Sequence, residues 1–518
     1  MKRAAAIAGL LLLFGLLNWN SFEAPFERDE GGYAYSAWVL RQGDLPYKDA
    51  FEQKPPMVIY TYFLGQLLEP VAVWPPRFLA ALFLAGTMIL MGLVAWKEFE
   101  GELGGGAGFI AMYLVLPMIL FPVLTPFAAN TEKFMLLPLL GVLALYVFNR
   151  DSRRGSPWFW GGVLSALALF YKPIALTAVS FIFLVWSYEL MRGQNGLKFL
   201  FRNLSLALTG FILAAALVFG YFLVRGAGGA LWETLVDFNR SYARSFGLSF
   251  SQFLSFLAKF WRYRWILFIL SAWYCVMRPP RAWFYLGLLF VSVATIFTSP
   301  IGHYYILLMP FWALITSAAV ADLGRLAQKR LGVKNAAAWI TAAVLALLLW
   351  PMRRQILSTP AQLNQWVYGD VNPFMDSPEV ARRVGALTSP GEKIFIAGSE
   401  PQIYYYAQRR SIGRFGTTYP LNVPTARREA YQEQAVKDLE ENPPPVIVVS
   451  RYSDTGLWDP GSPGLFMAHL NALLSRRYSL IGGTVWEGGG KFSWRQPLRP
   501  EEVRAAGFLV FRRSDRAI

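Results

Sequence analysis

Long apolar runs separated by short polar gaps occupy the first 351 residues of this chain. A helix that crosses a membrane needs about 20 mainly apolar residues, and several of these runs approach that length. We therefore predict a polytopic α-helical membrane protein with about eleven spans or more within residues 1–351. The predicted spans are 4–22, 76–96, 107–124, 133–148, 158–171, 174–190, 204–224, 264–277, 283–298, 304–320 and 336–351.

Two of these assignments leave an alternative open. The first run follows a basic start, which also suits a secretory signal peptide. We favour an uncleaved span for two reasons: no small-x-small cleavage site follows this run, and further apolar runs come after it. The runs 158–171 and 174–190 flank the pair Lys172-Pro173, so they are compatible with a hairpin or with one broken helix.

The pattern changes in residues 352–518, where short apolar runs alternate with charged stretches of helical period. The strands expected there lie near 393–398, 446–450, 479–485 and 507–512, and the helices near 400–408, 425–441 and 463–477. This alternation predicts a small α/β domain at the C-terminus, after a transmembrane domain at 1–351. No Gly-x-Gly-x-x-Gly segment opens a helix, so the sequence does not support nucleotide binding.

The composition agrees with a membrane protein and excludes several other classes. The chain of 518 residues is 55% hydrophobic and only 16% charged, whereas soluble proteins average about 25% charged residues. This richness in apolar residues excludes global disorder. Cys275 is the single cysteine, so no intrachain disulfide can form, and two histidines with one cysteine disfavour a structural zinc site.

The distribution of basic residues predicts the orientation in the membrane. The net charge is +16, and Lys and Arg concentrate in short, alternate gaps between the apolar runs. The positive-inside rule then predicts a cytoplasmic N-terminus, and an odd number of spans places 352–518 outside. Loops 23–75 and 225–263 also face outward, and the second is expected to be an interfacial helical segment because it is rich in aromatic and basic residues.

Candidate chemistry begins directly after the first span. Glu27, Asp29 and Glu30 place three acids within four residues. A preorganised carboxylate near the membrane surface can accept a proton from a hydroxyl group. The alternative is a solvated loop in which Asp29 caps a helix that starts at Glu30.

The same loop contains a cation at a fixed position. Lys54 precedes Pro55 and Pro56, which can start a helix and hold it at a set angle. Such a lysine could bind a phosphate as a point charge. A lysine that merely extends to the membrane surface is the alternative.

Further ionisable residues fall on the same predicted outer side. Glu132 opens the fourth span, with Asn130 or Thr131 as a simple cap in the alternative interpretation. Lys172 lies in an apolar stretch, where a lysine is usually paired or functional. His303, which precedes Tyr304, is either a structural or a functional residue. Together these residues predict an outer cavity that suits an anionic, lipid-linked donor.

A series of short motifs carries a resemblance to a known family. The motifs are Glu27-Arg28-Asp29-Glu30, Gly43-Asp44-Leu45-Pro46-Tyr47-Lys48-Asp49, Lys54-Pro55-Pro56, Asn130-Thr131-Glu132, Tyr171-Lys172-Pro173, His303-Tyr304-Tyr305 with Pro310, Gly398, Pro401-Gln402-Ile403-Tyr404 and Arg409-Arg410. Their order and spacing resemble those of GT-C membrane glycosyltransferases, in the bacterial branch related to protein O-mannosyltransferases and the lipid A aminoarabinose transferase. The resemblance covers nearly the whole chain.

The resemblance implies an enzyme of the bacterial inner membrane that transfers a hexosyl or pentosyl group from a polyprenyl-phosphate donor. The acceptor, on the extracytoplasmic face, is a protein, a glycolipid or a polysaccharide, and the reaction is a direct displacement with inversion. By carry-over, Asp29 is the catalytic base with Glu30 as its neighbour, and Lys54 lies near the donor phosphate.

The remaining positions of the carried-over site have less defined roles. Lys172 is a second candidate for binding the donor phosphate, and Glu132, His303 and Tyr304 line the cavity. Metal dependence varies within the family. The first loop lacks a separated Asp-x-Asp pair, so a divalent cation is not expected to be obligatory, although it is compatible with the site.

Two rival functions fit the same spans. A transporter or lipid flippase would favour two related halves with paired broken helices, and no such symmetry is visible in the sequence. A non-catalytic envelope scaffold would leave the acidic motif around Asp29 without a role. In the preferred interpretation, the C-terminal segment helps to select the acceptor.

Overall fold

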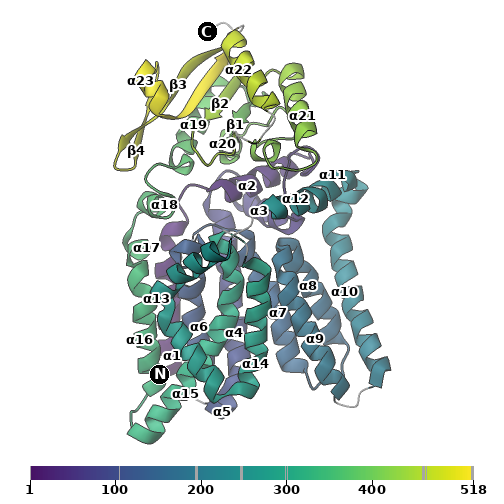
Figure 1. Ribbon diagram of the computed structural model, residues 1–518, viewed down its shortest axis with the longest axis vertical. Coiled ribbons are helices and arrows are strands. Elements are labelled where there is room, and N and C mark those ends of the chain that lie inside the picture. Colours follow the sequence, from purple (N-terminus) through teal and green to yellow (C-terminus); the bar gives the residue numbers. More distant parts are fainter. Residues whose placement is uncertain are drawn as a thin grey trace. The chain divides into compact units, whose positions relative to one another are not determined.

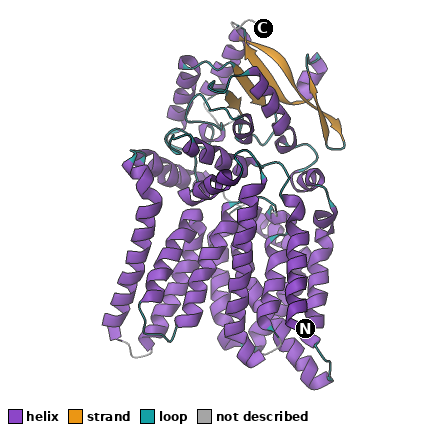
Figure 2. Ribbon diagram, turned by 180° about the vertical axis from the view of Figure 1, so that it is seen from behind, coloured by secondary structure: helices purple, strands orange, loops and turns teal. Residues whose placement is uncertain are grey.

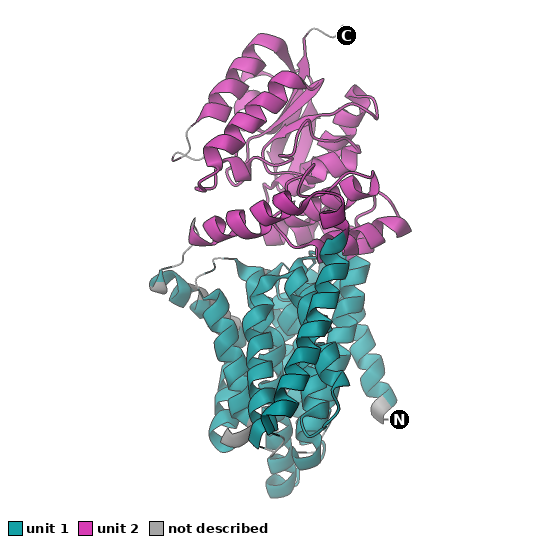
Figure 3. Ribbon diagram, turned by 90° about the vertical axis from the view of Figure 1, so that its right-hand side faces the viewer, with its two compact units in different colours: residues 1–21, 77–220, 246–358 teal, residues 22–76, 221–245, 359–518 magenta. Residues whose placement is uncertain are grey.

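The computed structural model describes residues 2–103, 106–125, 127–192, 196–245, 249–297, 299, 301–457, 461 and 464–514. Contacts divide the chain into two compact units, each built from separate stretches of sequence (Figure 3). Unit 1 combines residues 1–21, 77–220 and 246–358, and unit 2 combines residues 22–76, 221–245 and 359–518. The first predicted outer loop and the start of the second thus belong to the same unit as the C-terminal segment. The domain boundary after residue 351 stays a prediction.

Each of the eleven predicted apolar segments coincides with a helix (Figure 1). These helices are α1 (Lys2–Asn18), α4 (Trp74–Ala95), α6 (Ala107–Ile119), α7 (Thr131–Asn149), α8 (Ser156–Tyr171), α9 (Leu176–Arg192), α10 (Gly196–Val224), α13 (Phe250–Met277), α14 (Pro279–Ile296), α15 (Met309–Leu331) and α16 (Ala336–Leu349). The short helices α5 (Gly101–Leu103) and α17 (Arg353–Leu357) also belong to unit 1. Lys172 separates α8 from α9, so two helices flank the Lys-Pro pair.

Within the described residues, seven helical segments are long and apolar enough to cross a membrane. They are Ala4–Ser21, Trp74–Leu103, Thr131–Asn149, Pro173–Arg192, Gly196–Val224, Gly302–Leu331 and Ala336–Leu357. Shorter apolar helices accompany them at Pro56–Leu68, Ala107–Ile119, Arg264–Met277 and Ala282–Ile296. The prediction of a polytopic α-helical membrane protein is confirmed, whereas the count of eleven spans stays a prediction.

Helix α15 forms the centre of unit 1. Of its apolar span, 94% is buried, and the helix packs against α6, α13, α14 and α16. Close packing is possible because small residues line it; at Gly324, for example, an added Cβ would lie 2.5 Å from the Cα of Ala337. Helix α10 behaves differently, because exposed leucines such as Leu208 and Leu217 cover its surface. An apolar outer face of this kind suits contact with lipid chains.

Unit 2 begins with the helices of the first outer loop, α2 (Arg28–Arg41) and α3 (Pro56–Leu68). The second outer loop contributes α11 (Gly228–Trp232) and α12 (Asn239–Ser245), which agrees with the predicted helical segment, and its residues 246–248 lie outside the described residues. The helices of the C-terminal segment are α18 (Pro360–Tyr368), α19 (Pro373–Leu387), α20 (Gln402–Ala407), α21 (Arg428–Glu441), α22 (Leu465–Arg477) and α23 (Pro500–Ala505).

The C-terminal segment contains a five-stranded sheet (Figure 2). Its strands are β1 (Phe395–Ala397), β2 (Val446–Ser450), β3 (Tyr478–Gly488), β4 (Lys491–Arg495) and β5 (Ala506–Arg513), in the order β1-β2-β5-β3-β4. Among these five described strands, β1 and β2 pair in parallel, and the pairs β2–β5, β5–β3 and β3–β4 are antiparallel. One face of the sheet packs on an apolar core that includes Phe395, Ile447 and Phe466.

The four strands and three helices expected in this segment are all present, within a few residues of their predicted bounds. Helix α19 and strand β4 were not predicted. Two prolines made α19 hard to predict: Pro373 is its first residue, where proline is accepted, whereas Pro378 lies inside the helix, where proline is usually unfavourable. Strand β4 is short and lies at the edge of the sheet, after the three glycines of positive φ at 488–490.

Candidate functional site

The three acids at the start of α2 have different roles. Glu27 is the N-cap: its carboxylate accepts hydrogen bonds from the backbone N–H groups of Asp29 at 3.0 Å and Glu30 at 3.2 Å. Glu30 is fully buried, and its Oε2 accepts from the N–H of Glu27 at 3.4 Å. This reciprocal arrangement is a capping box. The alternative in which Asp29 caps a helix starting at Glu30 is therefore wrong, because the helix begins at Arg28 and Glu27 caps it.

Asp29 is the acid of this turn that the cap leaves available. Its side chain is partly exposed, and no hydrogen bond or ion pair engages its carboxylate within the part of the chain that is described. Burial, together with the charges of Asp29 and Glu30, raises the pKa of Glu27 well above its ordinary value. Glu27 therefore tends to keep a proton beside the carboxylate of Asp29. Such a carboxylate can take up a proton or attract a cation.

A fourth acid, Glu52, belongs to the same electrostatic group. It is 7% exposed, and burial raises its pKa to about 7, although Lys54 lowers it in part. Its Oε1 accepts the backbone N–H of Lys54 at 2.9 Å, and the charge of Asp29 also acts on its pKa. Sequence reasoning assigned Glu52 no role. The available signal was an acid two residues before the lysine of the Lys-Pro-Pro motif.

Lys54 occupies the position that the motif predicts. It immediately precedes Pro55, the N-cap of α3, and Pro56, its first residue, which confirms that the two prolines start a helix. The backbone carbonyl of Lys54 accepts a hydrogen bond from the hydroxyl of Tyr47 at 2.8 Å. Tyr47 is buried, and its φ of 74° is a backbone conformation that few residues other than glycine adopt. This loop conformation places the Tyr47 hydroxyl where it fixes the backbone of Lys54. The lysine side chain remains partly exposed.

Unit 1 brings together the other predicted site residues. The ammonium group of Lys172 pairs with Oε1 of Glu132 and lies 3.5 Å from the centre of the Tyr304 ring. The Nε2 atom of His303 is 3.6 Å from the same oxygen of Glu132. Glu132 and Lys172 are both buried, at 0% and 4% exposure. Residues far apart in sequence therefore form one polar cluster: Glu132, Lys172, His303 and Tyr304.

The local structure explains how the cluster is positioned. Glu132 lies in the first turn of α7, where the N-terminus of the helix favours a carboxylate. Asn130 holds the N-cap position by its backbone, but its side chain makes no capping hydrogen bond, so the simple-cap alternative does not describe it. Lys172 follows the last residue of α8, and a buried ion pair of this kind is costly to break. The predicted binding of a donor phosphate by Lys54 and by Lys172 stays a prediction.

The predicted site residues thus fall into two groups. Asp29, Glu30 and Lys54 lie in unit 2, and the polar cluster of Glu132 lies in unit 1. That all of them line one cavity stays a prediction. Among the described side chains, no group of three or more His, Cys, Asp and Glu residues lies so that it could hold a metal ion.

Comparison with known proteins identifies the fold. The structure is similar to the crystal structure of ArnT from Cupriavidus metallidurans bound to undecaprenyl phosphate, with a TM-score of 0.62 and 14% sequence identity over 95% of this chain and 97% of that chain. The apo structure of the same protein gives a TM-score of 0.60 over the same shares of both chains. No protein-family model matches the sequence, and no curated protein matches it significantly. The structural likeness shows that this chain and ArnT share a fold, which agrees with the predicted GT-C-like architecture.

Proposed function

We propose that this membrane protein of GT-C fold transfers a sugar from a polyprenyl-phosphate donor to an acceptor on the extracytoplasmic face of the bacterial inner membrane. The observation that carries the proposal is the fold it shares, over 95% of the chain, with a transferase crystallised with undecaprenyl phosphate. The acidic first turn of α2 supports it, because this turn presents one carboxylate, Asp29, that the fold itself does not use. The sugar is a hexose or a pentose.

In the proposed mechanism, Asp29 is the general base. It accepts the proton of the acceptor hydroxyl as the acceptor oxygen forms a bond to the anomeric carbon. The bond from that carbon to the phosphate oxygen breaks at the same time, on the opposite face, so the configuration inverts. The polyprenyl phosphate leaves with the electron pair of that bond.

The leaving phosphate needs a cation, because negative charge develops on its oxygen in the transition state. Lys54 is proposed for this role, since its side chain is partly exposed and since its charge and that of Asp29 both act on the pKa of Glu52. Lys172 would contribute only if its pair with Glu132 opened, and otherwise serves with His303 and Tyr304 as a rigid part of the cavity wall. The acceptor is a protein, a glycolipid or a polysaccharide.

The test is a transfer assay with purified protein in lipid. Radiolabelled polyprenyl-phosphate sugars are the donors and crude envelope fractions the acceptors. We expect Asp29→Asn to lower the transfer rate by about 100-fold or more, because general-base catalysis contributes about 10²–10⁴. Asp370→Asn is the matched control, since Asp370 is an exposed acid outside the proposed site.

Each outcome has a distinct meaning. Equal transfer by wild type and Asp29→Asn would keep the enzyme and reject Asp29 as its base. Absence of transfer from a broad panel of donors would count against the proposed function. In that case, movement of labelled lipid across proteoliposomes would test the flippase alternative.

A further inference from the structure

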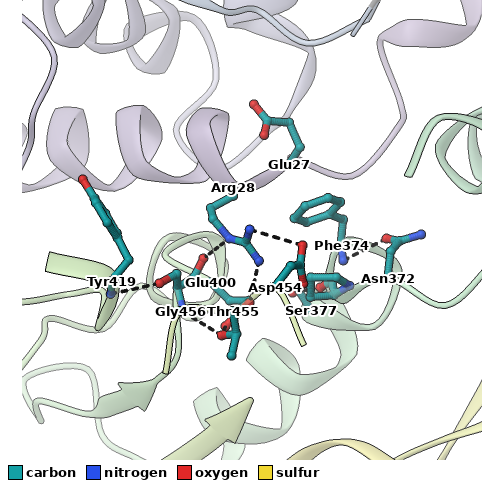
Figure 4. A network of polar contacts seen from close by, with 12 residues as sticks. Glu27, Arg28, Asn372, Phe374, Ser377, Glu400, Tyr419, Asp454, Thr455 and Gly456 are labelled. Atoms are coloured by element: carbon teal, nitrogen blue, oxygen red, sulfur yellow. Dashed lines mark hydrogen bonds and ion pairs between the residues drawn. The ribbon is translucent and has the colours of Figure 1, made fainter. Parts of the chain in front are cut away.

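Arg28, between the cap Glu27 and the proposed base Asp29, points toward the C-terminal segment. Figure 4 shows its side chain directed away from Glu27 and into a group of residues that includes Glu400, Asp454 and Thr455. Its Nε donates to the carbonyl oxygen of Ser399 at 2.7 Å, its Nη2 to Glu400 at 3.1 Å and its Nη1 to Asp454 at 3.3 Å. Every nitrogen of the guanidinium group therefore has an acceptor in the C-terminal segment.

Glu400 is the central partner of Arg28. It is fully buried, and its second carboxylate oxygen accepts the hydroxyl of Thr455 at 2.8 Å. The same hydroxyl oxygen of Thr455 accepts the backbone N–H of Ser399 at 2.9 Å, which closes the network. Asp454 contributes less, because its side chain is 62% exposed and water screens the pair. Without Arg28, Glu400 would be a buried carboxylate without its cation.

The contacts of Arg28 continue along one face of α2. Gly31, one turn later, lies so close to α20 that an added Cβ would be 2.7 Å from the backbone nitrogen of Gln402. After another turn, the Tyr35 hydroxyl accepts the N–H of Ser411 at 2.9 Å, and its ring stacks on Tyr404 with centroids 5.0 Å apart. Positions 28, 31 and 35 have the spacing of a single helical face.

Asp29 lies outside this docked face. Successive residues of a helix are about 100° apart around its axis. When Arg28 is anchored on the C-terminal segment, Asp29 therefore lies on the neighbouring face of α2. Gly32, one turn after Asp29, borders both sides: an added Cβ there would be 3.6 Å from Oε2 of Glu52 and 3.9 Å from Cγ of Pro401. One face of the helix therefore serves docking, and the neighbouring face presents the acid.

We propose that Arg28 is a positioning residue: its pair with Glu400 fixes the first turn of α2 on the C-terminal segment and thereby aims Asp29. The proposal rests on the proposed function, and it assigns the C-terminal segment a role in building the site besides any selection of the acceptor. A lysine cannot replace Arg28, because the three acceptors are met by three different nitrogen atoms of the planar guanidinium, whereas a lysine offers a single nitrogen.

The test compares Arg28→Lys and Glu400→Gln with wild type by hydrogen exchange and by transfer kinetics. Hydrogen exchange reports the order of α2 whether or not a donor is known, and β2 serves as the internal reference strand. The matched control is Glu379→Gln, which removes an exposed pair with Arg382 in the same unit. It leaves the network of Arg28 intact.

We expect exchange in residues 28–35 to rise severalfold in both variants while exchange in β2 stays unchanged. The kcat should fall by about 10- to 100-fold, as expected for misplacement of a catalytic group, with the donor KM within about twofold of wild type. Glu379→Gln should match wild type in every measurement.

Three results would overturn the proposal. One is unchanged exchange and unchanged kcat in both variants. Another is exchange that rises equally in β2, which would make the pair an ordinary stability contact. The third is a loss confined to KM. If wild type transfers no sugar at all, the proposed function fails, whereas the exchange of residues 28–35 still decides whether the pair holds the helix.

Discussion

At the scale of the residue, identical functional groups have different fates in this protein. Glu27, Asp29 and Glu30 are indistinguishable as acids in the sequence, yet two of them form the capping box and only Asp29 remains available. A carboxylate near a helix start can serve in capping or in proton transfer, so the pattern alone could not separate the two roles. Glu52 and Asp376 were missed for a related reason, because burial, which changes their chemistry, is not visible in sequence.

Asp376, in α19, has a distinctive environment in unit 2. Its Oδ2 accepts hydrogen bonds from the hydroxyls of Tyr452 at 2.7 Å and Thr484 at 2.6 Å. Burial raises the pKa of this carboxyl to about 7 in spite of both hydrogen bonds. An acid of this kind is mostly protonated in the folded protein below about pH 7.

This pKa predicts how stability depends on pH. Between about pH 4 and 7 the unfolded carboxyl ionises while the folded one keeps its proton, so the free energy of unfolding falls as pH rises. Each unit of pKa difference is worth about 1.4 kcal/mol. Asp376→Asn should remove this decline. The free energy of unfolding of the variant, relative to that of wild type, should therefore increase from pH 4 to 7 and stay constant above pH 7.

The measurement is the apparent unfolding temperature of wild type and Asp376→Asn from pH 4.5 to pH 8.5. Other buried acids contribute to both curves, so the difference between the curves isolates Asp376. Parallel curves would show that Asp376 has an ordinary pKa in the folded state.

At the scale of the element, α2 illustrates how two surfaces of one helix are determined. The start of α2 could be predicted from the sequence, because an acid-rich turn follows the first span. The partner of α2 could not, because Gly31 meets Gln402 across a separation that no local pattern encodes. The same holds for β4 and α19, whose place in the fold depends on the strands and helices that they pack against.

Close packing at Gly31 gives a test of this element. Gly31→Ala places a Cβ 2.7 Å from the backbone of Gln402, which cannot yield as a flexible side chain would. We expect a loss of about 1–3 kcal/mol in stability, as for other overpacked contacts, together with a lower transfer rate.

Gly385, near the end of α19, is the matched control. An added Cβ there meets no atom within 4 Å, so Gly385→Ala should gain about 0.5–1 kcal/mol from helix propensity alone. Thermal unfolding of both variants, measured side by side, checks the pair of predictions. Equal tolerance of both substitutions would argue against tight docking of α2 on α20.

At the scale of the whole molecule, the apolar pattern and the charge pattern carry separate information. The apolar runs predicted helices, and every one of the eleven runs coincides with a helix in the structure. The charge pattern predicts orientation, with basic gaps in the cytoplasm and the C-terminal segment outside. Orientation relative to a membrane remains a prediction of the sequence.

Cysteine labelling of intact cells tests this orientation. Cys275 is the only cysteine, so Cys275→Ala provides a background free of thiols. In that background, Ser514→Cys should react with a membrane-impermeant maleimide in intact spheroplasts, and Lys329→Cys only after the cells are opened. Both chosen positions are exposed in the structure. The reverse labelling pattern would invert the topology and reject an extracytoplasmic site.

The sequence by itself determined the class of the protein, the positions of its apolar helices, the main strands of its C-terminal segment and the residues of its acidic loop. It could do so because a helix in a membrane must satisfy its own backbone hydrogen bonds, which makes length and hydropathy sufficient signals. The tertiary structure alone decided which charges meet. Lys172 reaches Glu132 across 40 residues and Arg28 reaches Glu400 across 372. Such pairs depend on how distant segments pack, and a charged side chain in the sequence does not reveal whether folding will bury it beside a partner or leave it free for a substrate.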